Sequence, residues 1–173
     1  MSTSSFNLDA EALYLDLLEQ IKSQTTLDQK LAIVGIYSGG AWLAERLAKD
    51  LALHNKAGFI DVSFYRDDYA QKGLHAEVKP TQIPFDVNGA SIILVDDVLY
   101  TGRTTRAAIN ELFDYGRPAK IMLATLVDRG GRELPIAADF AAHTIDAAAY
   151  DKSHSINLQR AEDGTFSLSI DHA

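Results

Sequence analysis

The chain has 173 residues, of which 47% are hydrophobic and 23% are charged, and it carries a net charge of −8 with a pI near 5.0. That length is enough for one compact domain with a sizeable core. No apolar run approaches the roughly 20 residues needed to span a membrane, and cysteine is absent. We therefore expect a cytoplasmic protein without disulfides or thiolate metal sites. The acidic balance disfavours non-specific binding to nucleic acids.

Helix-like and strand-like segments alternate along the chain. Apolar residues recur at helical spacing in some segments, and short runs of apolar and β-branched residues separate them. In chain order, these patterns predict a helix over 8–21, a strand over 31–37, a helix over 41–53, strands over 58–65 and 91–95, a helix over 104–115 and a strand over 119–127. Near the C-terminus, segments 156–158 and 166–170 flank the turn sequence Glu162-Asp163-Gly164, which predicts a hairpin.

This alternation predicts an α/β fold with a mainly parallel sheet that helices cover on both faces. In such sheets, ligands bind beyond the carboxyl ends of the strands, near a topological switch point. We therefore expect the loops after Tyr37, Asp96 and Val127 to gather at one edge of the sheet. The long polar segment over 66–89, which two prolines interrupt, is typical of a lid or a disordered segment.

A candidate anion site stands where the helix over 104–115 begins. The sequence there is Thr101-Gly102-Arg103-Thr104-Thr105. The first turn of a helix offers unpaired N–H groups and the positive end of the helix dipole, glycine allows close approach of the backbone, and threonine hydroxyls are further donors. The segment lacks the GxxxxGK[ST] and GxGxxG patterns of nucleotide-binding loops. Its features predict a cradle for a single phosphate group.

Two adjacent carboxylates, Asp96 and Asp97, come shortly before this cradle, at the end of the predicted strand. A carboxylate would repel a bare phosphate, but it can accept hydrogen bonds from sugar hydroxyls and can hold Mg²⁺ directly or through water. A ribose 5-phosphate would suit both groups of residues, with its phosphate in the cradle and its hydroxyls at the two carboxylates. Taken alone, two adjacent acids are as typical of a solvated turn as of a ligand site. The threonine-rich segment alone is as typical of a helix cap. Their joint occurrence at short spacing favours the ligand site.

The hydrophobic run, the acid pair and TGRT together resemble the signature that binds phosphoribosyl diphosphate (PRPP) in type I phosphoribosyltransferases. Within that superfamily, VDDVLYTGRTTRAA resembles the PyrR family, whose members combine uracil phosphoribosyltransferase activity with regulation of pyrimidine operons through RNA. The match continues over 35–47, 63–68 and 127–136. It implies the type I phosphoribosyltransferase fold over 1–173, with a small hood over about 136–173. The N-terminal helix is a candidate part of that hood.

By this resemblance, Asp96 and Asp97 are catalytic, contact the ribose hydroxyls and hold the Mg²⁺ that arrives with PRPP, through water or through PRPP itself. The residues implied to bind the 5-phosphate are Thr101, Gly102, Arg103, Thr104 and Thr105. The implied pyrophosphate loop consists of Tyr37, Ser38, Gly39 and Gly40, with a cis peptide bond between the first two. Arg66 opens the implied catalytic flexible loop. The implied base-binding residues are Val127, Asp128 and Arg129.

Two positions depart from the family pattern. Many relatives carry basic residues in the pyrophosphate loop, where this chain has Tyr37 and Gly39, and RNA-binding relatives carry histidine where this chain has Gly131. The first departure leaves pyrophosphate binding to backbone N–H groups, Mg²⁺ and the flexible loop. The second disfavours RNA binding, so we favour an enzyme that converts PRPP and uracil to UMP and pyrophosphate. The alternatives are a purine phosphoribosyltransferase and an RNA-binding regulator that senses UMP or PRPP. Candidate residues for an RNA-binding patch are Arg117, Lys120, Arg129 and Arg132. Family members form dimers and larger assemblies, so we also expect at least a homodimer.

Overall fold

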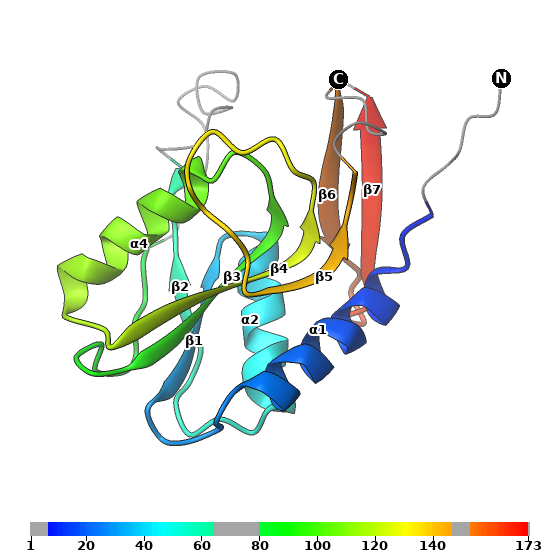
Figure 1. Cartoon of the computed structure of the whole chain (residues 1–173). Helices are drawn as coiled ribbons and strands as arrows, with labels where there is room; N and C mark the ends of the chain where they lie inside the picture. Colours follow the sequence, from blue (N-terminus) through cyan, green and yellow to red (C-terminus); the bar gives the residue numbers. More distant parts are fainter. Residues whose placement is uncertain (1–6, 64–79, 147–152, 173) are drawn as a thin grey trace, which may run out of the picture.

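The computed structural model describes residues 7–63, 80–146 and 153–172 (Figure 1). Within these residues the main sheet has five strands in the order β2-β1-β3-β4-β5, and every pairing in it is parallel. The strands are β1 (Leu31–Ile36), β2 (Gly58–Ile60), β3 (Ser91–Leu99), β4 (Lys120–Asp128) and β5 (Phe140–Thr144). A separate antiparallel hairpin consists of β6 (His154–Arg160) and β7 (Phe166–His172). The predicted α/β class with a parallel sheet is confirmed.

Helices cover both faces of the main sheet (Figure 1). Helices α1 (Ala10–Gln24) and α2 (Gly39–Asp50) pack on one face, and α4 (Arg103–Tyr115) packs on the other. Successive strand residues point to opposite faces: Ile93 joins the core beneath α1 and α2, whereas Leu94 joins the core beneath α4. Because both faces are buried, the strands are continuously apolar rather than alternating.

The order of the strands creates a switch point between β1 and β3. From β1 the chain runs to α2 and β2 on one side of the sheet, and from β3 it runs to β4 and β5 on the other. The carboxyl ends of β1, β3 and β4 lie side by side, because Gly35 pairs with Val95 and Val98 pairs with Val127. The loops that the sequence predicts to gather at one edge therefore do so, at the place where ligands bind in such sheets.

The bounds of the predicted elements shift by one to five residues in the structure, and three of these shifts lie at strands or helices that border the carboxyl edge of the sheet. The strand predicted over 58–65 ends at Ile60, because the Asp61 carboxylate accepts a hydrogen bond from the Ser63 N–H at 2.8 Å and turns the chain. Residues 64 and 65 lie outside the described residues. The helix predicted over 41–53 begins earlier, at Gly39, and ends at Asp50. The strand predicted over 91–95 extends further, to Leu99.

Strand β5 was not predicted from the sequence. It extends the main sheet at its edge, where Thr125 pairs with Ala141 and Val127 pairs with His143. The hairpin is longer than predicted, since its pairs run from one end of β6 to the other. The hood over about 136–173 stays a prediction. The hairpin fits it, because it is separate from the main sheet, whereas β5 is part of that sheet. None of the helices in the described parts of the chain has the length and apolar character needed to cross a membrane.

Candidate active site

The two adjacent carboxylates lie within β3 and not at its end. The strand was predicted to stop at Val95, but it continues to Leu99 because its pairing with β4 continues that far. Asp96 is only 6% exposed, and its Oδ1 accepts a hydrogen bond from the Asp97 N–H at 2.9 Å. Asp97 Oδ1 accepts a second one from the Val98 N–H at 2.9 Å. These backbone contacts restrict both side chains before any ligand arrives.

Both carboxylates line a pocket of about 300 Å³ at the carboxyl edge of the main sheet. The pocket also has walls from the loop after β3 and the start of α4, namely Val98, Leu99, Tyr100, Thr101, Gly102, Thr104 and Thr105. Arg129, Ile156 and Asn157 complete its lining. The structure thus brings together the predicted acid pair, most of the predicted phosphate cradle and one residue of the predicted base loop.

The start of α4 has the geometry that a phosphate cradle needs. Gly102 is the N-cap of α4 and has a φ of 92°, in the left-handed region that favours glycine. A Cβ at this position would lie 3.0 Å from Ile136 Cγ1, so the site also lacks space for a side chain. The Thr101 hydroxyl accepts a hydrogen bond from the Arg103 N–H at 3.2 Å. Gly102, Thr104 and Thr105 line the pocket, and the first N–H groups of a helix have no partner within it, so an anion bound here could pair with them.

Thr105 carries a buried hydroxyl for which the described residues provide no hydrogen-bond partner. The side chain is 1% exposed and lines the pocket. A buried polar atom without a partner costs about 1–3 kcal/mol, and native proteins rarely contain one without a reason. A phosphate oxygen of a bound ligand would supply the missing acceptor.

Thr105→Val should therefore weaken PRPP binding without weakening the fold. A lost hydrogen bond to a charged group is worth about 1.5–3 kcal/mol, so the KM for PRPP should rise by tenfold or more, while Tm stays equal or increases slightly. Thr125→Val is the matched control. Thr125 is fully buried, and its hydroxyl donates to Asp97 O at 3.2 Å and Val127 O at 3.1 Å, so this variant should lower Tm. Equal loss of Tm in both variants would contradict the assignment of Thr105.

The predicted base loop is held in place by Arg132. This guanidinium donates to Ile136 O at 2.8 Å, to Tyr100 O at 2.9 Å and to Asp128 Oδ2 at 2.6 Å. The other oxygen of Asp128 accepts a hydrogen bond from the Gly130 N–H at 3.0 Å. Asp128 is thus engaged within the protein, and the loop after β4 is fixed against the loop after β3.

Arg129 reaches the pocket across the ring of Tyr100. Its guanidinium carbon lies 4.1 Å from the ring centroid, within cation–π range. A Cβ on Gly131 would lie 2.5 Å from Tyr100 Cε2, and Gly131 has a φ of 77°. The ring therefore requires glycine at 131. Val127, the remaining predicted base residue, is fully buried in the core and does not line the pocket.

The predicted pyrophosphate loop forms the start of α2. The peptide bond between Tyr37 and Ser38 is cis, as the resemblance implies, and Ser38 is the N-cap of the helix. A Cβ on Gly39 would lie 2.5 Å from Asp97 Oδ2, so the helix start packs directly against that carboxylate. Burial raises the pKa of the Tyr37 phenol, so this side chain is neutral at pH 7. None of the four loop residues lines the pocket itself.

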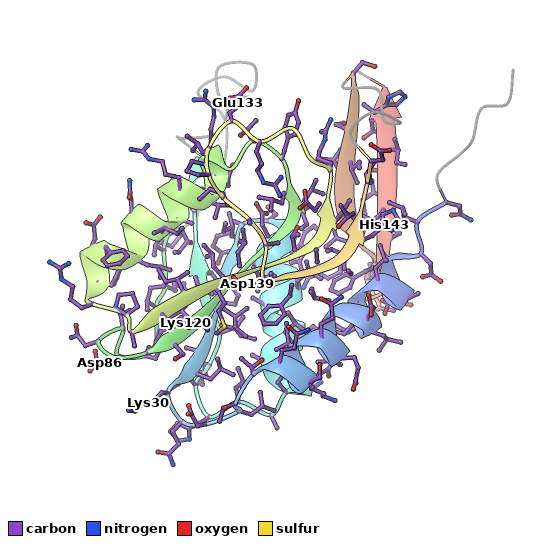
Figure 2. All side chains as sticks on the ribbon, viewed as in Figure 1. Lys30, Asp86, Lys120, Glu133, Asp139 and His143 are labelled. Atoms are coloured by element: carbon purple, nitrogen blue, oxygen red, sulfur yellow. The ribbon has the colours of Figure 1, made fainter. Side chains whose placement is uncertain are left out.

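Arg103, a residue of the predicted cradle, does not line the pocket. Its guanidinium pairs with Glu133 at 2.7 Å, and both side chains are 52% exposed. Figure 2 shows Glu133 on the loop beyond the carboxyl edge of the main sheet. Arg66, the predicted catalytic cation, lies outside the described residues.

The resemblance implies that the hood covers the base, but the sequence did not show which residues of the hairpin line the pocket. Ile156 and Asn157 of β6 line it, and the Leu158 N–H approaches Asp97 Oδ2 at 3.5 Å. These residues lie about 60 positions after the acid pair, and no local pattern links them to it. The available signal in the sequence was the alternation of Ile156 and Leu158 with polar residues, which predicts a strand with one face turned toward the protein, as the burial along β6 shows.

The acid pair fits Mg²⁺ that arrives with a substrate. Carboxylate oxygens are ligands that Mg²⁺ prefers, and it usually binds through one or two carboxylates together with substrate phosphates. The described residues contain no group of three or more His, Asp or Glu side chains that could hold a metal ion by themselves. Asp96 and Asp97 could therefore complete a coordination shell but not build one alone.

Comparison with known proteins defines the class of this fold. Residues 7–151 match the family described as the phosphoribosyl transferase domain. A hypoxanthine-guanine phosphoribosyltransferase from Bacillus anthracis has a similar structure, with a TM-score of 0.63 and 20% identity over 81% of this chain and 83% of that one. A hypoxanthine phosphoribosyltransferase from Staphylococcus aureus gives a TM-score of 0.61 and 23% identity over 82% of this chain and 77% of that one. These similarities identify a type I phosphoribosyltransferase fold.

Sequence similarity identifies the family within this class of folds. The protein called Bifunctional protein PyrR in Ralstonia nicotianae is 55% identical over 84% of this chain and 84% of its own length. Its namesake in Nitrosococcus oceani is 48% identical over 82% of both chains, and the one in Pseudomonas aeruginosa is 54% identical over 65% of this chain and 66% of its own. The chain belongs to the PyrR family of phosphoribosyltransferases.

Proposed function

We propose that this chain is a uracil phosphoribosyltransferase, which transfers the phosphoribosyl group of PRPP to uracil and yields UMP and pyrophosphate. The observation that carries the proposal is one pocket shared by the acid pair, the start of α4 and the loop after β4. These three groups suit the hydroxyls, the phosphate and the base of a nucleotide, respectively. The name Bifunctional protein PyrR of the relatives is consistent with an enzyme that has a second role.

The start of α4 and the acid pair would orient the ribose. The helix N–H groups and the Thr105 hydroxyl donate to the 5-phosphate, while Asp96 and Asp97 accept hydrogen bonds from the 2- and 3-hydroxyls. Bound Mg²⁺ supplies positive charge that offsets the charge of the pyrophosphate. With both ends of the ribose fixed, C1 is held between the departing pyrophosphate and the incoming base. The contribution of these residues is chiefly positioning.

The base would lie against the loop after β4. A pyrimidine needs donors for O2 and O4 and an acceptor for N3–H, and a fixed backbone can supply both. The contacts of Arg132 with Tyr100 and Asp128 support this role, because they hold the loop in one conformation. Arg66 is our candidate for stabilising the charge on the leaving pyrophosphate.

The RNA-binding regulator is the second candidate function, and the distribution of cations disfavours it. Lys120 begins β4, whereas Arg129 and Arg132 follow its carboxyl end. Figure 2 shows Lys120 and Glu133 at opposite ends of the main sheet. Three donors of Arg132 are already used within the protein. RNA binding needs several phosphate contacts from one surface. On a single chain, these described cations lie on different surfaces.

The test is pyrophosphate release by the purified protein with PRPP, Mg²⁺ and each of uracil, hypoxanthine, guanine and orotate. We expect release with uracil alone. Release with a purine would keep the PRPP site but reject the assignment of the base loop. Tight binding of UMP without release with any base would favour a sensor, and RNA binding at stated salt concentrations would then be measured. The predicted homodimer is checked on the same preparation by light scattering.

A further inference from the structure

Three separate elements meet at the side chain of Arg46 on α2. Its Nη1 donates to Glu11 Oε1 at 2.9 Å and its Nη2 lies 2.8 Å from Glu11 Oε2, which makes a two-pronged ion pair with the first turn of α1. Glu11 Oε1 also accepts a hydrogen bond from the Phe166 N–H of β7 at 2.8 Å. We call Glu11, Arg46 and Phe166 the clamp. One carboxylate in it connects α1, α2 and the hairpin.

The clamp is packed as well as charged. The Arg46 guanidinium carbon lies 4.1 Å from the Tyr14 ring centroid and 5.0 Å from that of Phe166, and the two rings meet edge-on at 5.9 Å. Tyr14 is fully buried and donates its hydroxyl to Asp50 Oδ2 at 2.7 Å. Aromatic contacts that shield a two-pronged ion pair make it stronger than an exposed pair. The hydrogen bond from Arg46 also lowers the pKa of Glu11, so the carboxylate is charged at neutral pH.

The hairpin that the clamp holds is also a wall of the pocket. Phe166 pairs with Arg160 at one end of the hairpin. Ile156, which lines the pocket, lies four residues earlier on β6, roughly 13 Å away at about 3.3 Å per residue. Because the two strands are paired along their whole length, a shift at the clamped end would also displace the wall that lies against Asp97.

We propose that Arg46 is a positioning residue, which acts through Glu11 and Phe166 to hold the hairpin against the pocket for binding of the base. The inference rests on the proposed function, since it assigns the wall of β6 to substrate binding. The chain also provides a readout that does not depend on turnover. Trp42, the only tryptophan in the sequence, lies on α2 with the Arg160 guanidinium of β6 at 5.0 Å from its ring. Its exposure therefore reports on the position of the hairpin.

The first comparison uses steady-state kinetics. Arg46→Met keeps an unbranched side chain against the aromatic rings but removes the ion pair, and we expect a fivefold or larger rise in the KM for uracil with kcat changed less than twofold. Arg46→Lys, which retains the charge without the two-pronged geometry, should lie between this variant and the wild type. Glu11→Gln should reproduce the effect of Arg46→Met, and combining the two should add little, because both break one contact. Leu17→Ala, which truncates a fully buried side chain of α1, is the stability control and should lower Tm without raising this KM.

The second comparison uses acrylamide quenching of Trp42. Arg46 lies one turn from Trp42 on the same helix, so Glu11→Gln is the informative variant. We expect stronger quenching in Glu11→Gln than in the wild type, and no increase in Leu17→Ala. An unchanged KM in Arg46→Met, with Tm reduced as in the control, would overturn the inference. If the wild type turns over no base, the proposed function fails, and the quenching decides alone: equal quenching in Glu11→Gln and the wild type would overturn the positioning role.

Discussion

The double variant Asp96→Asn, Asp97→Asn should release pyrophosphate from PRPP and uracil at least 100-fold more slowly than the wild type. Asparagine keeps an oxygen that can accept the hydrogen bonds from the Asp97 and Val98 N–H groups, so β3 should keep its local conformation. Under the proposed function, the variant loses negative charge where the ribose hydroxyls and Mg²⁺ would bind. Each charged hydrogen bond contributes about 1.5–3 kcal/mol, and two of them correspond to roughly 100-fold or more in rate.

The measurement is the initial rate of pyrophosphate release at saturating Mg²⁺, together with circular dichroism and Tm. Asp86→Asn is the matched control, since the Asp86 carboxylate also accepts a backbone hydrogen bond, from the Asn88 N–H at 3.0 Å. Figure 2 shows Asp86 and Glu133 at opposite ends of the main sheet, and Asp86 does not line the pocket. The control should retain the wild-type rate. A double variant that folds and also keeps this rate would refute the role of the acid pair.

The geometry of the candidate phosphate cradle could be predicted because its parts are contiguous. Residues Thr101 to Thr105 open α4, and a helix start has the same free N–H groups wherever it occurs. Gly102 has the positive φ that a glycine at such a turn permits. The acid pair was correctly associated with the cradle, but its place in β3 was not. The length of β3 depends on pairing with β4, which lies more than 20 residues further along the chain.

Arg132 illustrates what the sequence could not provide. It was a candidate cation for binding RNA, and the structure instead uses it to join Asp128, Ile136 and Tyr100. All surface arginines look alike in a sequence, because their partners are chosen by the packing of distant loops. The same applies to Ile156, whose place in the pocket wall depends on how the hairpin packs against α1 and α2. Local chemistry could be predicted, whereas contacts that cross between elements could not.

Gly39→Ala should impair catalysis nearly as much as removal of the Asp97 carboxylate, although the substitution adds only one methyl group. The added Cβ would lie 2.5 Å from Asp97 Oδ2 and 2.7 Å from its Cγ. The Asp97 carboxylate can rotate away from the added Cβ. The Asp97 Cβ itself, at 2.9 Å, requires a small shift of the backbone, and we expect the protein still to fold. Overpacking of this kind costs about 1–3 kcal/mol, which corresponds to a loss of roughly 2–12 °C in Tm at this chain length. We expect kcat/KM for PRPP to fall by roughly tenfold or more, the loss that corresponds to one of the two charged hydrogen bonds.

The neighbouring Gly40→Ala should fail in a different way and serves as the comparison. Its Cβ would lie 2.3 Å from Val95 O and 3.0 Å from the Asp96 Cα. Both are backbone atoms of a central strand and cannot yield without disturbing the sheet. We expect little soluble protein or a much larger loss of Tm than in Gly39→Ala. Combining Gly39→Ala with Asp97→Asn should reduce the rate little further than either change alone, because both act on one carboxylate. Fully additive losses would show that Gly39 acts on the reaction independently of Asp97.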